Sequence, residues 1–166
     1  MPKAGARFGG TFFVEAYDKQ GRLKWKDTAK NIVVKKGIQH ILDGTFAGGT
    51  QVNPWYTGLM ATTDITDTYT STDISEATEC SDANRPAYVD ARSSETVSNV
   101  AAKSTFNINA DGTTIEGAFL ISSNDFGSMD GLLLSGAPFT GGGKSLASGE
   151  KLVVTYYFVG SNDTSS

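Results

Sequence analysis

The chain has 166 residues and a formal net charge of −4; 39% of its residues are apolar and 19% are charged, and 19 are glycine. A chain of this length fits one domain that buries about 70% of its unfolded surface, and this composition suits short strands and turns better than long helices. The single cysteine, Cys80, excludes an intramolecular disulfide, and no segment approaches the ~20 apolar residues of a membrane span. We expect one domain over residues 1–166, made in a reducing cytoplasm, with no export signal and no membrane contact.

The charged residues divide the chain into a basic start and an acidic remainder. Residues 1–36 carry nine basic and three acidic side chains, whereas the rest carry five basic and fifteen acidic ones. The basic block is either a solvated hairpin or an arm that docks onto an acidic surface of a second copy or of a shell protein. The acidic remainder argues against nucleic acid as a partner.

The first predicted element is a hairpin within a basic N-terminal arm of about residues 7–30. Residues 11–17 and 22–26 read as its strands, and Asp18-Lys19-Gln20-Gly21 reads as a four-residue loop. In the expected register, Tyr17 faces Arg22, Ala16 faces Leu23 and Val14 faces Trp25.

One short helix follows a β-branched strand at residues 31–34. In Lys35–Asp43, the apolar residues Ile38, Ile41 and Leu42 recur at helical spacing, and Gly44 is expected to end the helix. An aromatic-rich strand is then expected over residues 55–60. Residues 62–84 are threonine-rich and acidic with few apolar anchors, which predicts a long loop that takes part in an interface.

The clearest local signal lies between Phe106 and Ile121. Asp111-Gly112 is typical of a type I′ turn, and a hairpin centred on it would align the apolar residues on one face. Residues 132–135 and 152–159 are the last expected strands. Because residues 152–159 are apolar on both faces, this strand should be central in a sheet or covered by a partner.

Seven or eight strands with a single helix predict an all-β fold. We expect one β-sandwich with jelly-roll or Greek-key connections. No repeat of 20–50 residues is evident, which argues against a solenoid or a β-helical shaft.

Residues that could carry chemistry are few. His40 is the only histidine, and its place inside a short helix favours a structural role over catalysis. Cys80 lies beside Glu79 and Asp82, whose charge should raise its pKa and make it a poor nucleophile. We predict no catalytic residue, no cofactor and no metal ligand.

Three motifs have simpler explanations than ligand binding. Residues 141–145 (GGGKS) resemble the end of a phosphate-binding loop, but Pro138 occupies the position of its first glycine. Residues 107–112 mimic a calcium loop, although a hairpin explains them better. A cation held by acidic-loop carboxylates such as Asp64, Asp67 or Asp73 is the less favoured alternative to solvated side chains.

An ordered set of short motifs resembles small virion structural proteins of tailed bacteriophages. The likeness covers residues 31–158 and lies in segments 31–38, 55–59, 84–88, 106–120 and 146–156. The resemblance implies a protein of the capsid decoration (cement) type, or a small protein of the tail or its fibres, and it implies no catalysis.

We therefore expect a non-enzymatic virion protein on the capsid surface that bridges subunits of the major capsid protein. It is expected to assemble with itself as a trimer or a dimer, because closed symmetric assembly is usual for such subunits. The residues expected at its interfaces are Arg7, Phe8, Phe12, Phe13, Lys24, Trp25, Lys26, Trp55, Tyr56, Arg85 and Tyr88.

Two other functions fit the same residues. One is a tail, collar or fibre-associated protein of the same particle. The other is a carbohydrate-binding β-sandwich that uses Trp25, Trp55 and Tyr56 as a stacking platform.

Overall fold

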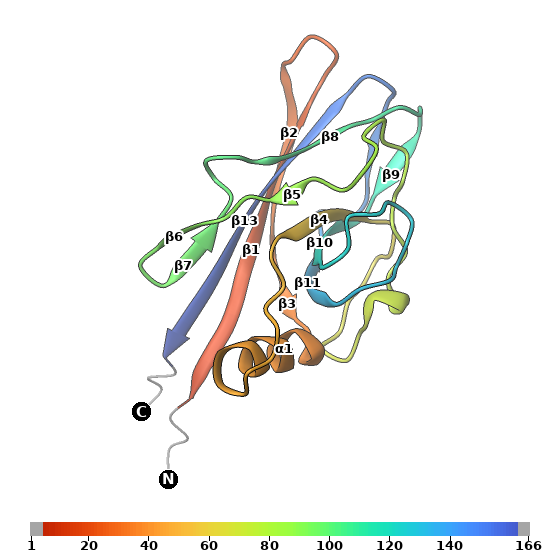
Figure 1. Ribbon diagram of the computed structural model, residues 1–166. Helices are drawn as coiled ribbons and strands as arrows, with labels where there is room; N and C mark the ends of the chain where they lie inside the picture. The colour runs from red at the N-terminus through yellow and green to blue at the C-terminus, as the bar shows by residue number, and fades with distance from the viewer. Residues whose placement is uncertain (1–4, 163–166) are drawn as a thin grey trace.

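The computed structural model describes residues 5–162, which form antiparallel sheets, one α-helix and one short 3-10 helix (Figure 1). The six-stranded sheet contains β1 (Ala6–Tyr17), β2 (Leu23–Lys30), β6 (Ala91–Ser93), β7 (Thr96–Ser98), β8 (Ser104–Asn107) and β13 (Lys151–Asn162). The five-stranded sheet contains β3 (Ile32–Val33), β4 (Trp55–Met60), β5 (Ala87–Tyr88), β10 (Gly117–Ile121) and β11 (Leu133–Pro138). A two-stranded sheet pairs β9 (Thr113–Ile115) with β12 (Lys144–Leu146), the helix α1 spans Lys35–Phe46, and a short 3-10 helix spans Ser71–Asp73.

The all-β class is confirmed, whereas the expected single sandwich is replaced by several sheets. The strand order is β2-β1-β13-β7-β6 in the six-stranded sheet, with β8 also on β13, and β3-β11-β10-β4-β5 in the five-stranded sheet. One apolar cluster joins the two sheets: Phe12 and Val154 come from the first, and Leu59 and Leu120 from the second. Alternating side chains along both sets of strands build this core.

The strands β1 and β13 form the long axis of the six-stranded sheet (Figure 1). They pair without interruption from Ala6 opposite Asn162 to Tyr17 opposite Lys151. On its other edge, β13 pairs with β7 and β8, so it is the central strand that its two apolar faces predicted.

The N-terminal hairpin is present, but its expected register is wrong. Ala16 pairs with Trp25 and Val14 with Asp27, and a bulge accommodates the extra residue Lys24. The loop runs through Arg22, because the Asp18 carboxylate accepts hydrogen bonds from the backbone N–H groups of both Gln20 and Arg22. The longer loop and the bulge shift every pair by comparison with a four-residue turn.

The helix extends three residues beyond the expected end at Asp43. The carbonyl of Asp43 accepts hydrogen bonds from the N–H groups of Ala47 and Gly49, and Gly48 adopts a φ of 72°. Gly48, not Gly44, therefore supplies the left-handed residue that ends the helix. Near the start of α1, Gly37 packs against the backbone of Leu134, and a β-carbon there would clash with that carbonyl.

The hairpin expected over residues 106–121 is wrong. Phe106 pairs with Leu152 in the six-stranded sheet, whereas residues 117–121 pair with β4 and β11 in the five-stranded sheet. Gly112 has a positive φ, but Asp111 does not, so the type I′ geometry is absent. The segment crosses between sheets instead of folding back on itself.

The acidic loop covers the outer face of the five-stranded sheet. Ile65 and Ile74 from the loop pack against Met60, Phe119 and Ile121 in a second apolar cluster. These sheet residues alternate with those that face the main core, because neighbouring side chains in a strand point to opposite faces. The loop is therefore a layer of the fold, and only its exposed side chains are free to meet a partner.

Candidate functional site

The structure places the eleven residues expected at an interface in three environments. Those buried in the interior are Phe12, Arg85 and Tyr88. Those partly buried against the apolar clusters are Phe8, Trp25, Trp55 and Tyr56. Those with exposed side chains are Arg7, Phe13, Lys24 and Lys26.

The interface assignment of the three buried residues is corrected, because they are core residues. Phe12 stacks on Tyr156 with ring centroids 4.2 Å apart. The Tyr88 hydroxyl donates to the carbonyls of Val97 and Tyr156, and burial raises its pKa well above the ordinary value. Neither side chain offers surface to another protein in this conformation.

Arg85 holds two loops together inside the molecule. Its guanidinium donates to both carboxylate oxygens of Glu76 and to the carbonyls of Ser123 and Ser128. It also lies 5.6 Å from the centroid of the Phe119 ring. Both side chains of the ion pair are almost fully buried, so this arginine has a structural role.

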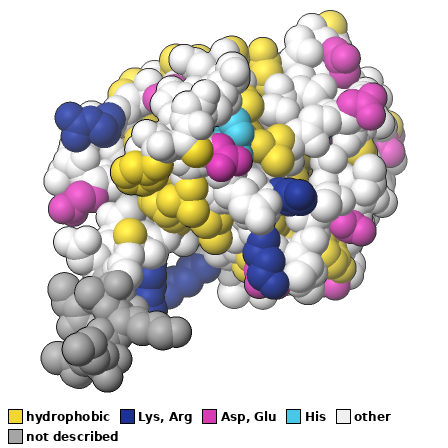
Figure 2. Space-filling model, turned by 60° about the horizontal axis from the view of Figure 1, so that its bottom comes forward, with side chains coloured by type: hydrophobic (Ala, Val, Ile, Leu, Met, Phe, Trp, Pro, Cys, Tyr) yellow, Lys and Arg dark blue, Asp and Glu magenta, His cyan; other side chains and the backbone are white. Residues whose placement is uncertain are grey.

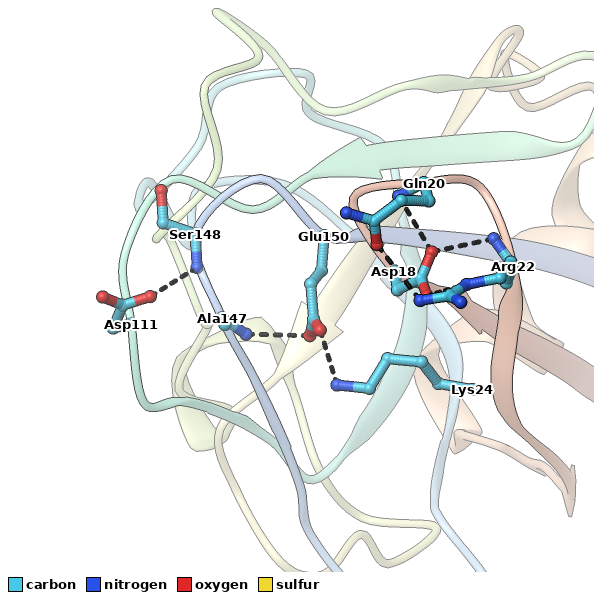
Figure 3. Close-up of polar contacts among 8 residues, drawn as sticks. All are labelled: Asp18, Gln20, Arg22, Lys24, Asp111, Ala147, Ser148 and Glu150. Carbon is cyan, nitrogen blue, oxygen red and sulfur yellow. Dashed lines mark hydrogen bonds and ion pairs between the residues drawn. The ribbon is translucent and has the colours of Figure 1, made fainter.

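Lys24 has an internal partner, which Figure 3 shows beside the hairpin loop. Its ammonium donates to Glu150, whose other oxygen accepts from the backbone N–H of Ala147. Desolvation would raise the pKa of Glu150, but these two hydrogen bonds outweigh it, and the net pKa is lowered. The pair fastens the tip of β2 to the turn that precedes β13.

Figure 3 also shows how the neighbouring loop is fixed. The Asp18 carboxylate accepts from Gln20 and Arg22, and the Asp111 carboxylate accepts from the backbone N–H of Ser148. Hydrogen bonds, chiefly from the Arg22 backbone, lower the pKa of Asp18. The tip of the basic arm is thus held by local contacts.

Two of the expected interface residues, Phe13 and Lys26, have exposed side chains on the outer face of the six-stranded sheet. Phe13 is 42% exposed and meets the Tyr157 ring edge-on, with centroids 5.3 Å apart. Together with Lys26, Val100, Lys103 and Tyr157 it lines one depression. We call these five residues the apolar-basic face; the same depression is also lined by Asp27 and by Glu15, which pairs with Lys103 at 3.2 Å.

The expected carbohydrate platform is not formed. Trp25 packs edge-on against Phe139, whereas Trp55 packs against His40. Tyr56 turns toward the second apolar cluster on the opposite side of β4. Because the three rings lie in three different environments, they do not provide one stacking surface.

A cavity that the sequence did not reveal lies at the end of the molecule that carries α1. It has a volume of about 320 Å³ and is lined by α1, the segment before β4, the end of β5, the middle of β13, and single residues of β7, β10 and β11. His40, Gln51, Asn53, Trp55 and Asp90 contribute to its walls. The sequence carried only a weak signal for this cavity, because these wall residues come from three separate segments and show no recognisable spacing.

The candidates for chemistry show no catalytic arrangement. His40 accepts a hydrogen bond through Nε2 from the backbone N–H of Val52. Cys80 is buried, and desolvation together with nearby Asp82 and Glu79 raises its pKa to about 12, as its acidic neighbours predicted. A thiol with this pKa is protonated at neutral pH and is a weak nucleophile.

The three acidic-loop carboxylates considered as cation ligands each interact with a different protein group. Asp64 accepts from the Tyr69 hydroxyl, Asp67 pairs with Lys35, and Asp73 accepts from Thr70 at the start of the 3-10 helix. Within residues 5–162, no three His, Cys, Asp or Glu side chains are grouped closely enough to hold a metal ion.

The two remaining motifs are parts of loops and strands. In residues 141–145, Lys144 begins the strand β12, and its ammonium lies over the Trp25 ring. In residues 107–112, the side chain of Asn107 donates to Asp82. Both contacts are internal to the fold.

In the part of the chain that the structure describes, no helix combines the length and the apolar character needed to cross a bilayer. No family model, no curated protein and no solved structure matches this chain, so its function has to be argued from the geometry above.

Proposed function

We propose that this chain is a virion structural protein that decorates a capsid shell and stabilises it by bridging subunits of the major capsid protein. It is made in the host cytoplasm and ends on the capsid surface. Its proposed action is binding rather than reaction.

The observation that carries the proposal is the apolar-basic face. Large apolar side chains that are exposed together on one face are typical of protein contact surfaces. Phe13 is 42% exposed and Val100 is 50% exposed, although each would gain by burial. Glu15 and Asp27 balance the charges of Lys26 and Lys103 on this face, and Glu15 pairs with Lys103, so the exposed apolar side chains are the feature that favours a contact.

The shell interface and self-association together account for the expected stability on the particle. A stable interface buries on the order of 1,200–2,000 Å² in total. One depression on one subunit is smaller than that, so we propose that a trimer or a dimer multiplies the contact. Several weak contacts held in one oligomer bind more tightly than any one of them alone.

Cryo-electron microscopy of the intact particle tests the proposal. Density for this chain in many copies across the capsid lattice, with the apolar-basic face against the shell, is the expected result. Density confined to the tail or to one vertex would replace decoration by the tail, collar or fibre alternative.

A binding experiment tests the face itself. We expect the double variant Phe13→Ser/Lys26→Glu to lose binding to particles assembled without the protein. The matched control is Leu23→Ser/Lys36→Glu, which makes the same changes at exposed positions elsewhere. Equal binding by both variants would exclude the apolar-basic face as the contact.

A further inference from the structure

The cavity beside α1 has a well-defined aromatic floor. Tyr88 and Tyr156 lie 5.9 Å apart between ring centroids, and Tyr156 and Phe158 lie 6.4 Å apart. The Tyr88 hydroxyl is fixed by two carbonyls, so this part of the floor is held in place. Trp55 provides a further, partly exposed ring in the wall.

The rim of the cavity is polar and comes from separate segments. His40 lies on α1, Gln51 and Asn53 precede β4, and Asp90 follows β5. In Figure 2 the histidine, in cyan, lies at the surface among hydrophobic side chains with an acidic side chain beside it. The mouth is therefore open to a ligand from solvent.

Hydrogen-bonding capacity remains available at this rim. Within residues 5–162, the side chains of Asn53 and Asp90 make no hydrogen bond or ion pair with the protein. His40 uses Nε2 as an acceptor for Val52, which leaves Nδ1 as the donor of the neutral ring. The rim thus offers both donors and acceptors.

The charge of the lining selects the kind of ligand. Asp90 is its one carboxylate, and none of the residues that line the cavity is Lys or Arg. An anion would meet a negative charge without compensation, which disfavours phosphates and acidic sugars. A simple cation would use the carboxylate and the rings, but it would leave the amide N–H donors of Asn53 without a role, whereas the amide of Gln51 already donates to the carbonyl of Gly44.

We propose that this cavity binds one unit of a neutral sugar. A sugar ring has an apolar face of C–H groups, which fits the aromatic wall at Trp55, and hydroxyls that donate to Asp90 and accept from Asn53. The volume lies at the small end of the range for ligand sites, as a single sugar unit requires. The site is distinct from the platform of Trp25, Trp55 and Tyr56, which does not form.

This inference does not depend on a position in the virion. The cavity is lined by α1, β4, β5 and Tyr156 and Phe158 of β13, whereas the apolar-basic face lies on the outer side of the six-stranded sheet. A decoration protein docked through that face would keep the cavity available. The two proposals can therefore fail separately.

The test is a titration of the isolated full chain with glucose, galactose, mannose and N-acetylglucosamine. The variant Trp25→Phe leaves Trp55 as the single tryptophan, so its fluorescence reports on the cavity. We expect a saturable change for at least one of these sugars, in the millimolar range usual for small ligands in open sites. No saturable change with any of the four would overturn the proposal.

Variants then assign the binding to the cavity. Asp90→Asn should weaken the affinity by about tenfold or more, as expected when a hydrogen bond to a charged acceptor is lost. Asp125→Asn is the matched control at an exposed aspartate elsewhere, and both variants should unfold at the temperature of the parent chain. Equal loss in both variants, or binding of tetramethylammonium in preference to the sugars, would contradict a neutral sugar site.

Discussion

Arg85 and Glu76 form a two-pronged ion pair inside the protein, with Nε–Oε1 and Nη2–Oε2 distances of 2.6 and 2.8 Å. The exposed fractions of the two side chains are 0% and 1%. Gly127 also donates its N–H to Glu76, so the pair joins the acidic loop to the loop after β10. Buried charges of this kind are stable only when their hydrogen bonds are complete.

Removal of either partner should destabilise the protein strongly. We expect Arg85→Met or Glu76→Gln to lower the free energy of unfolding by about 3–5 kcal/mol, because each leaves a buried group without its partner. Urea denaturation followed by tryptophan fluorescence measures the change. Arg92→Met, at an exposed arginine, is the matched control and should change stability by less than about 0.5 kcal/mol.

The double variant Arg85→Met/Glu76→Met checks the physical reason. If an uncompensated charge is the cause, the loss in the double variant should be smaller than the sum of the two single losses. Strict additivity would show that the two residues act independently, in conflict with the contact between them.

Local patterns in the sequence predicted those elements whose formation does not depend on which strand lies beside them. The helix, predicted over residues 35–43 and found over Lys35–Phe46, and the strand at residues 55–60 follow from spacing and composition within each segment. The centrality of residues 152–159 follows from two apolar faces, since both must be covered. These predictions need no knowledge of which strand lies next to which.

The predictions that were wrong depend on which distant segment a residue pairs with. Asp111-Gly112 favours a local hairpin, but Phe106 instead buries its ring in pairing with Leu152, 46 positions along the chain. An apolar stripe is equally compatible with either partner, so the pattern could not decide between them. Arg85 was expected at the surface because nothing in its local sequence marks Glu76 as a buried partner.

The cavity beside α1 illustrates the same limit for a candidate binding site. Trp25, Trp55 and Tyr56 were expected to form one platform, but Tyr56 faces the opposite side of β4 from Trp55, because adjacent residues in a strand face opposite sides, and Trp25 packs on Phe139. The true neighbours of Trp55 include His40 and Asp90, which the fold brings from a helix and a strand end. Only the tertiary structure places them together.

The Cys80 thiol should be unreactive in the folded protein. Its side chain is buried, and its pKa is raised to about 12 by desolvation and by Asp82 and Glu79. At pH 8 we expect no modification by iodoacetamide over the time in which free cysteine reacts fully, and complete modification in urea. Mass spectrometry measures both. Rapid labelling without denaturant would mean that this part of the acidic loop opens readily.

Variants of Lys24 and Lys26 should have different effects, the first on stability and the second on binding to the shell. Lys24→Met removes the cation beside Glu150, which is 7% exposed, and should lower the free energy of unfolding by about 1 kcal/mol at pH 7. Lys26→Met should leave stability unchanged and weaken association with the shell. The opposite assignment of the two effects would contradict the placement of Lys26 on the contact face.

The effect of Lys24→Met should also depend on acid pH. The pKa of Glu150 is lowered in the fold from its ordinary value of 4.5, so the stabilisation is present above pH 4.5 and is lost as pH falls through the folded pKa. Denaturation curves of the parent chain and of Lys24→Met should therefore converge in acid. A difference that stays constant with pH would point to lost packing of the lysine stem instead.

Tyr88 should make the fold sensitive to alkali. Burial raises the folded pKa of its hydroxyl well above the ordinary value of 10.0, so at higher pH the unfolded chain releases a proton that the folded chain keeps. The free energy of unfolding then falls by about 1.4 kcal/mol per pH unit above pH 10 for this group. Tyr88→Phe removes that slope, and it also loses the hydrogen bonds to Val97 and Tyr156, at about 1 kcal/mol near neutral pH. Urea denaturation of both proteins from pH 8 to pH 11.5 measures the effect. The free energy of unfolding of the parent chain should exceed that of Tyr88→Phe near neutral pH, and the difference should shrink as pH rises. A difference that stays constant with pH would mean that the Tyr88 hydroxyl ionises as readily in the fold as in the unfolded chain.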